Sequence, residues 1–172
     1  ELARICVPVF GSGSMWKRGK TVTVFDERIE TLREAMRAEH IDFYLIPTAD
    51  DHASEYVSDY YKVRNYYAGF TGSAGTAVIT QDEACLWTDG RYFVQAAKEL
   101  AGTGVTLMKM GQEGVPTVEE YLQANTKEGM TIGFDGRVVN EMLGEALEKT
   151  LPERFLSYRS DLIGEIWSDR PA

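Results

Sequence analysis

Segments with helical periodicity alternate with short apolar runs along this chain, and this alternation restricts the fold more than any other feature. The expected strands cover 42–48, 75–80, 84–89, 105–110, 130–135 and 154–158. The expected helices cover 26–39, 90–100, 117–125 and 140–150, with Asp26 as the cap of the first, and the aromatic-rich stretch 50–67 is irregular with a short helix. One short turn joins strands 75–80 and 84–89 into a hairpin. The pattern predicts a single α/β domain whose mixed, mostly parallel sheet is flanked by helices.

The two ends of the chain differ in character from the middle. Residues 1–21 include the alternation Gly-Ser-Gly-Ser before Met15, which is typical of a flexible tail or an engineered linker. Either Met15 is the native start or residues 1–14 are a natural tail. Residues 22–160 are expected to form the domain. The ending 161–172, DLIGEIWSDRPA, is interpreted as a linker towards a further domain, so we expect the chain to be a fragment.

The charge balance excludes several classes of protein. The chain has 27 acidic and 18 basic residues and a net charge of −9, which argues against a nucleic-acid or anionic membrane surface. The two cysteines, Cys6 and Cys85, make no disulfide framework, and Cys85 is expected to be a small buried residue. No apolar run is long enough for a membrane-spanning helix, and no signal peptide is recognisable. A cytoplasmic protein is therefore expected.

A glycine-rich stretch between Gly69 and Ala97 raises the question of what its glycines serve. Gly69, Gly72 and Gly75 have a spacing one residue too wide for a dinucleotide-binding loop, and a strand follows them instead of a helix. The remaining interpretation is structural, because glycines allow the chain to turn and a neighbouring backbone to approach closely.

Two catalytic or metal-binding interpretations of nearby residues are weak. Ser73 lacks the first glycine of a nucleophile elbow, and the chain has only His40 and His52 as candidate bases. His40 is expected at an exposed helix end. Asp50, Asp51, His52 and Glu55 (the 50–55 cluster) crowd together but lack a complete ligand set. A turn formed by aspartate side chains, with a helix cap, is the favoured interpretation of this cluster.

The tripeptide Asp89-Gly90-Arg91 falls where a strand ends and a helix begins, and such strand ends collect binding residues in α/β sheets. An arginine there can grip a carboxylate or a carbonyl oxygen. The alternative is an ion pair between Asp89 and Arg91 or a solvated arginine, and spacing alone favours this alternative slightly.

Several long motifs together resemble the amino-terminal domain of the three-domain Xaa-Pro aminopeptidases (aminopeptidase P) of the creatinase/prolidase family. The resemblance covers about Val22 to Pro171, and it is carried by the segments IPTADDHASEY, FTGSAGTAVIT, LWTDGRYFVQAAKEL, LMKMG, PTVEEYL and EIWSDRP. It implies a ribonuclease-H-like α/β domain with no catalytic function of its own, which helps to bind the peptide and to shape access to the active site. The full-length enzyme would remove the N-terminal residue that precedes proline.

The resemblance also implies where the chemistry lies. Two divalent metals, commonly manganese, would be held in a carboxy-terminal domain that this chain lacks, so no catalytic residue, metal ligand or cofactor is expected here, and the fragment is expected to be inactive. The implied partners are a proline-containing peptide, the missing domains and a second copy of the full-length enzyme, with no nucleic acid and no membrane.

Within this resemblance, Arg91 occupies the position of an arginine on the substrate side of the cleft. Asp89 and Gly90 would form the turn that presents it, and His52 would help to shape the site. Two alternatives stay open, namely a stand-alone binding module of the same fold and the N-terminal domain of a prolidase. The intact TDGRY motif favours the enzyme over the module, and the LMKMG and EIWSDRP segments favour the aminopeptidase over prolidase.

Overall fold

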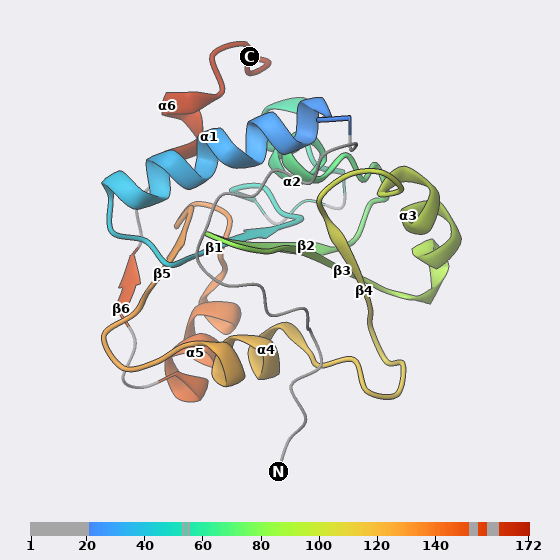
Figure 1. The fold of residues 1–172 in the computed structure, drawn as a ribbon. Coiled ribbons are helices and arrows are strands. Elements are labelled where there is room, and N and C mark those ends of the chain that lie inside the picture. The colour runs from blue at the N-terminus through green and yellow to red at the C-terminus, as the bar shows by residue number, and fades with distance from the viewer. Residues whose placement is uncertain (1–20, 53, 55, 152–154, 158–161) are drawn as a thin grey trace.

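The fold is a six-stranded mixed sheet between two layers of helices (Figure 1). The computed structural model describes residues 21–52, 54, 56–151, 155–157 and 162–172. The strands are β1 (Phe43–Pro47), β2 (Thr76–Thr80), β3 (Ala84–Thr88), β4 (Thr106–Lys109), β5 (Thr131–Phe134) and β6 (Phe155–Ser157), in the order β4-β3-β2-β1-β5-β6. β2 is antiparallel to both of its neighbours, and the other three pairings are parallel. The expected mixed, mostly parallel α/β fold is therefore confirmed.

Helices cover both faces of the sheet. They are α1 (Val24–Ala38), α2 (Val63–Ala68), α3 (Phe93–Glu99), α4 (Val118–Asn125), α5 (Glu141–Thr150) and α6 (Leu162–Ile166), with short 3-10 turns η1 (Asp59–Tyr61) and η2 (Gly90–Tyr92). Figure 1 shows α1, α2, α3 and α6 over one face and α4 and α5 over the other. None of the helices in the described ranges is long and apolar enough to cross a membrane.

Helix α1 begins two residues earlier than its sequence predicts. Thr23 is the N-cap, and its side chain accepts a hydrogen bond from the backbone N–H of Asp26, whose carboxylate accepts in return from the backbone of Thr23. This reciprocal capping box satisfies backbone donors that the first helical turn leaves unpaired. Asp26, expected to be the cap itself, is thus its partner. At the other end, the exposed His40 adopts a left-handed φ of 56°, and Ile41 N–H closes the helix on the carbonyl of Met36 at 2.8 Å.

Two hydrophobic cores lie on opposite faces of the sheet, because successive side chains of a strand point to opposite sides. Tyr44 and Ile46 of β1 face the layer of α1, α2, α3 and α6, whereas Phe43 and Leu45 face α4 and α5. Cys85 is buried in the second core, as expected. Burial of these strands on both faces explains their nearly continuous apolar sequences.

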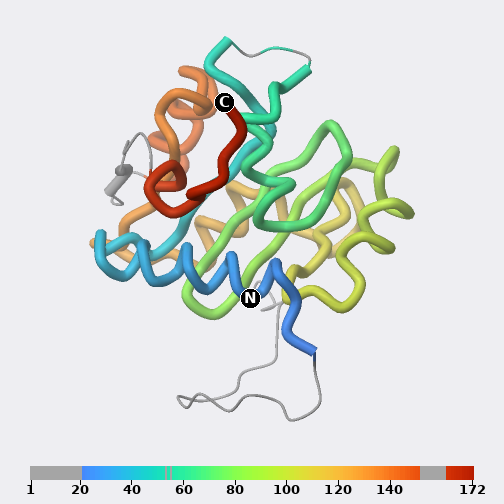
Figure 2. Tube along the Cα trace, turned by 90° about the horizontal axis from the view of Figure 1, so that it is seen from above, coloured from blue at the N-terminus to red at the C-terminus, as the bar shows by residue number. Residues whose placement is uncertain are grey.

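The packed domain extends beyond the boundary predicted after residue 160. Leu162 and Ile163 of α6 are buried in the first core, and the Trp167 ring stacks on Tyr66 with 4.1 Å between ring centroids. The chain then returns to lie beside the segment that holds η1 (Figure 2). Arg170 Nε donates to the carbonyl of Tyr60 in η1 at 2.8 Å. Residues 162–167 are therefore part of the domain rather than a free linker. The predicted continuation into another domain stays a prediction. Of the predicted tail 1–21, residues 1–20 lie outside the described residues.

Candidate functional site

The carboxyl-terminal ends of β1, β3 and β5 lie at one edge of the sheet, because these three strands run parallel to one another. The segment 69–75, the glycine-rich loop, crosses this edge before it enters β2. Thr48 Oγ1, directly after β1, donates to the carbonyl of Gly75 at 2.7 Å, and Thr88 Oγ1, at the end of β3, donates to the carbonyl of Ala74 at 2.7 Å. The loop is thus tied to two strand ends.

The glycines of this loop are required by close packing. Gly69 ends α2 with a left-handed φ of 75°, which a residue with a side chain rarely adopts. A Cβ atom on Gly72 would lie 2.2 Å from the Phe70 ring, and one on Gly75 would lie 2.7 Å from the carbonyl oxygen of Trp87. The loop is followed by a strand and not by a helix, so it has no helix N-terminus for a phosphate. The structural interpretation of these glycines is therefore confirmed.

Side chains of α3 hold the glycine-rich loop from the other side. The Glu99 carboxylate accepts hydrogen bonds from the backbone N–H and the hydroxyl of Thr71, at 2.9 Å and 2.7 Å. Burial raises the pKa of Glu99, but the hydrogen bonds from Thr71 outweigh it and hold the pKa below its ordinary value. Ser73 Oγ and Tyr92 Oη share a hydrogen bond of 2.6 Å. Ser73 is therefore paired with a tyrosine, and this contact links the loop to the turn that carries Arg91.

The TDGRY turn places Arg91 at the same edge of the sheet. Asp89 caps η2, where its side chain accepts from the backbone N–H of Arg91 at 3.0 Å. The same carboxylate accepts from Arg91 Nε and Nη2, both at 2.9 Å. These hydrogen bonds lower the pKa of Asp89 and raise that of Arg91. The ion pair considered as the alternative is thus present, yet the Arg91 side chain remains 70 % exposed, with its guanidinium 5.2 Å from the centre of the Tyr92 ring.

A second turn of the same kind follows β5, and the sequence interpretation missed it. Asp135 accepts from the backbone N–H of Arg137 at 2.9 Å, and its carboxylate oxygens accept from Arg137 Nε at 3.0 Å and Nη2 at 2.7 Å. Hydrogen bonding to Asp135 raises the pKa of Arg137. Arg137 Nη1 also donates to Tyr60 Oη at 3.3 Å, so this arginine is more enclosed than Arg91. The repeated tripeptide Asp-Gly-Arg after two expected strands was the signal available in the sequence.

His52 lies in a separate loop after β1. Its backbone N–H donates to Asp50 Oδ1 at 3.0 Å, and Ser54 N–H donates to the same oxygen at 2.9 Å. The hydrogen bond from Ser54 comes first among the causes that lower the pKa of Asp50. The expected aspartate-centred turn is confirmed, but no helix begins in the described residues 50–52. The His52 imidazole is 81 % exposed and lies 3.6 Å from the Asp51 carboxylate, so its site-shaping role stays a prediction.

A cavity of about 260 Å³ (the β1-end cavity) lies beside the glycine-rich loop. Its described lining consists of Pro47, Thr48, Tyr56, Val57, Tyr61, Lys62, Arg64, Asn65, Thr71, Gly72 and Ser73. Arg64 is only 3 % exposed; its Nη2 donates to the carbonyl of Gly72 and to Asn65 Oδ1, and its guanidinium lies 4.7 Å from the centre of the Phe70 ring. Burial lowers the pKa of Arg64 to about 10. A buried arginine at this position was not predicted.

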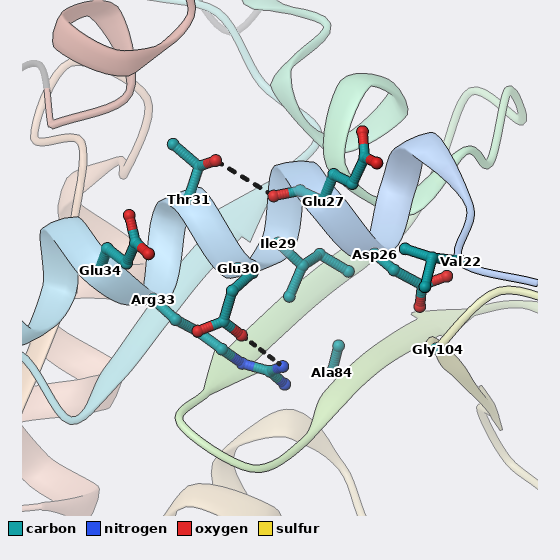
Figure 3. A pocket seen from close by; sticks show the side chains of 10 residues that line it. All are labelled: Val22, Asp26, Glu27, Ile29, Glu30, Thr31, Arg33, Glu34, Ala84 and Gly104. Carbon is teal, nitrogen blue, oxygen red and sulfur yellow. Dashed lines mark hydrogen bonds and ion pairs between the residues drawn. The ribbon is translucent and has the colours of Figure 1, made fainter. Parts of the chain in front are cut away.

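A larger cavity of about 450 Å³ opens along α1, and Figure 3 shows its lining. It reaches Ala84, the first residue of β3, and therefore lies at the opposite end of this strand from Asp89. Its polar groups come mainly from α1, where Glu30 and Arg33 form an ion pair at 3.6 Å (Figure 3). None of the predicted site residues lines this cavity. The sheet edge with Arg91 and the β1-end cavity is therefore the better candidate site.

The described residues do not assemble a metal centre. No group of three or more His, Cys, Asp or Glu side chains suitable for a metal ion occurs in the ranges that the structure describes. Asp50, Asp51 and His52 lie in one turn, and Glu55, the fourth member of the 50–55 cluster, lies outside the described residues.

Comparison with known proteins gives consistent matches over most of the chain. Residues 28–166 match the family described as the Creatinase/Prolidase N-terminal domain. A probable Xaa-Pro aminopeptidase P from Talaromyces marneffei is 43 % identical over 150 residues, which cover 85 % of this chain and 23 % of that protein. Aminopeptidase P2 from Arabidopsis thaliana is 40 % identical over 159 residues, which cover 89 % and 22 % of the two chains.

A solved structure supports the same relationship. The X-prolyl aminopeptidase from Caenorhabditis elegans, described as a cytosolic enzyme with a di-nuclear active site, superposes with a TM-score of 0.80 at 35 % identity. The superposition covers 86 % of this chain and 26 % of the worm enzyme. The chain thus spans roughly a quarter of the length of the relatives that it matches.

Proposed function

The chain belongs to the creatinase/prolidase N-terminal domain family, and on this premise we propose that it is the N-terminal domain of a longer Xaa-Pro aminopeptidase. Such an enzyme removes the N-terminal residue of a peptide when proline follows it. The observation that carries the proposal is the match, at 35–43 % identity, to relatives named for this activity, of which the chain covers only about a quarter.

In this proposal the domain binds substrate and shapes access to the active site, and Arg91 is the residue that contacts the peptide. Asp89 occupies Nε and Nη2 of Arg91, which fixes the plane of the guanidinium and leaves Nη1 for an acceptor. The 70 % exposure of this side chain supports contact with a ligand or a neighbouring domain. A peptide carbonyl is a suitable acceptor, because holding a peptide in register supplies the positioning that the distant chemistry requires.

The chemistry itself is assigned to the part of the longer protein that this chain lacks. The worm relative is described as having a di-nuclear active site, whereas the described residues here hold no cluster that could bind a metal. The proposal therefore places two divalent metals, manganese by preference, in a separate domain, and it expects this chain alone to be inactive. The cytosolic worm enzyme supports a cytoplasmic location for the full-length protein. The proposal also includes a homodimer of the full-length enzyme.

Kinetics of the full-length enzyme test the role of Arg91. Arg91→Ala is expected to lower kcat/KM for Xaa-Pro peptides by roughly ten- to hundredfold, the range for loss of a hydrogen bond to a charged group. Arg91→Lys should recover part of this loss, because the charge remains. Arg37→Ala, on the exposed face of α1, is the matched control.

The metal content of the purified full-length variants separates a role of Arg91 in substrate binding from a role in maintaining the structure. It should be unchanged in Arg91→Ala, Arg91→Lys and Arg37→Ala. Wild-type kinetics in Arg91→Ala would remove Arg91 from the site while leaving the family assignment intact. Full-length protein with bound metal but no cleavage of any Xaa-Pro peptide would contradict the proposed activity itself.

A further inference from the structure

Tyr92 contacts both Arg91 and the glycine-rich loop. The Arg91 guanidinium carbon lies 5.2 Å from the centre of the Tyr92 ring, which is within the range of a cation–π contact. The Tyr92 hydroxyl shares a hydrogen bond of 2.6 Å with Ser73 Oγ, 19 residues earlier in the chain. The side chain next to the proposed substrate-contacting arginine is therefore fixed at its polar end to the loop.

The Tyr92 ring is also packed against the glycine-rich loop. It meets the Phe70 ring edge to face, with 5.9 Å between the ring centroids. An ideal Cβ atom at Gly72 would lie 2.9 Å from Tyr92 Cδ1, so the ring can approach the loop this closely only because residue 72 has no side chain. Packing of the ring and the hydrogen bond of the hydroxyl thus hold Tyr92 at the same segment.

The loop that receives Tyr92 is itself fixed to two helices. From α2, the buried Arg64 donates through Nη2 to the carbonyl of Gly72. From α3, the Glu99 carboxylate accepts from the backbone N–H and the hydroxyl of Thr71. The two residues before Ser73 are therefore held by different helices, and the position of the Ser73 hydroxyl is set by the packed domain.

The ion pair with Asp89 does not by itself fix the Arg91 side chain relative to the rest of the domain. Both residues belong to the same turn, and both side chains are partly exposed to solvent. Exposed ion pairs hold their partners weakly, because water and salt compete for both groups. The Tyr92 ring differs from Asp89 in being anchored outside the turn, so contact with this ring relates the guanidinium to the glycine-rich loop.

We infer that Ser73 and Tyr92 are positioning residues for Arg91. The hydrogen bond between their hydroxyls holds the Tyr92 ring at the glycine-rich loop, and the ring orients the Arg91 guanidinium at the edge of the sheet. The loop thus has a role beyond close packing, because it supports the side chain on which the arginine rests. The effect on peptide cleavage rests on the proposed function of Arg91, whereas the orientation of Arg91 is a property of this chain alone.

Two conservative variants remove the hydrogen bond and keep the packing. Tyr92→Phe retains the ring that contacts Arg91 but removes the hydroxyl, and Ser73→Ala removes the other partner. Ser73 is exposed and Tyr92 is half-buried, so water can reach the hydroxyl that remains in each variant, and both variants should fold. The matched control is Thr31→Ala, which removes an exposed hydroxyl on α1 that donates to the carbonyl of Glu27 at 3.1 Å.

NMR spectroscopy of the ¹⁵N-labelled chain tests the orientation of Arg91 without any peptidase activity. The Arg91 Nε–H signal is recorded at mildly acidic pH, where its exchange with water is slow, and Tyr92→Leu gives its chemical shift without the ring current. In Tyr92→Phe and Ser73→Ala this shift should move towards the Tyr92→Leu value, and the ¹H–¹⁵N heteronuclear NOE of the Nε–H should fall. Thr31→Ala should leave both unchanged. Wild-type values in Tyr92→Phe and Ser73→Ala would overturn the inference.

Kinetics of the full-length enzyme test the consequence for cleavage. Tyr92→Phe and Ser73→Ala should each lower kcat/KM for Xaa-Pro peptides by roughly two- to tenfold, the range for loss of one neutral hydrogen bond. The double variant should lose no more than either single variant, because both changes remove the same hydrogen bond. In an Arg91→Ala background neither change should have a further effect. Additive losses, or the same losses without Arg91, would contradict the inference.

The two experiments separate failure of this inference from failure of the proposed function. If Arg91→Ala impairs cleavage but Tyr92→Phe and Ser73→Ala do not, the hydroxyl pair does not position Arg91 for the substrate, and the inference is wrong. If Arg91→Ala itself leaves the kinetics unchanged, the proposed contact of Arg91 with the peptide fails, and the NMR experiment alone decides whether the loop orients this arginine.

Discussion

Adding one methyl group at Gly75 should destabilise the domain, because the structure leaves no room for it. An ideal Cβ there would lie 2.7 Å from the carbonyl oxygen of Trp87 and 3.2 Å from Arg64 Nη1. Trp87 is completely buried and pairs with Thr76 in the β2–β3 ladder, so its carbonyl cannot retreat without disturbing that pairing. Overpacking of this kind costs roughly 1–3 kcal/mol, and we expect about 2 kcal/mol for Gly75→Ala. For a domain of this size, that corresponds to a melting temperature lower by roughly 4–8 °C.

Two other glycines provide controls: one substitution is expected to stabilise the domain, and the other is expected to leave its stability nearly unchanged. Gly144 lies within α5 with open space around its Cα, so Gly144→Ala should stabilise the domain by about 0.5–1 kcal/mol through helix propensity. Gly90→Ala should be nearly neutral, since the closest neighbour of its Cβ would be a Phe93 ring atom at 3.9 Å. Urea unfolding followed by tryptophan fluorescence and circular dichroism measures all three variants. A Gly75→Ala protein as stable as the wild type would refute the packing argument for the glycine-rich loop.

Two further predictions concern the C-terminal helix and the TDGRY turn. Trp167→Ala should lower the free energy of unfolding by about 3–5 kcal/mol, because a buried ring stacked on Tyr66 is lost; an unchanged urea midpoint would show that residues 162–167 do not belong to the folded domain. The hydrogen bond from Arg91 lowers the pKa of Asp89 in the folded domain. The ionised Asp89 carboxylate therefore stabilises the turn fully above the unfolded pKa of about 3.9, and this stabilisation is lost as pH falls through the lower folded pKa. Carbon-detected NMR titration of Asp89 should give a midpoint below that ordinary value, and a midpoint at or above it would show that the ion pair does not form in solution.

Most of the fold follows from patterns that are local in the sequence. Continuous apolar runs identified the six strands, and the short turn between 75–80 and 84–89 identified the hairpin. The helix expected over 90–100 is instead divided into η2 and α3, because Asp89 caps a tight first turn. Residues 161–172 were interpreted as a linker because an Ile-Trp pair followed by SDRPA resembles one, whereas the structure has the five-residue helix α6 there. Its stability comes from burial of Leu162 and Ile163 and from the contact of Trp167 with Tyr66, which only the folded chain brings together.

The candidate site was predicted in part, for a similar reason. The position of Arg91 at a strand end was readable from the tripeptide that contains it, and the same reasoning applied to Arg137 would have found the second turn. Arg64 gave no such signal, since its burial depends on how the glycine-rich loop folds back over α2. Hydrophobic periodicity predicts which apolar residues are buried, but it does not predict which charged residue is enclosed with them.

The central claim, that this chain is one domain of a longer Xaa-Pro aminopeptidase, is tested most directly on the native gene product. An antibody against the domain would capture the protein from its source cells, and the same sample would be used for intact mass and for cleavage of an Xaa-Pro peptide. We expect a polypeptide several-fold heavier than the 19.3 kDa of this chain, with metal-dependent release of the residue before proline. A native product near 19.3 kDa, or a larger protein that leaves Xaa-Pro peptides intact in the presence of manganese, would contradict the claim.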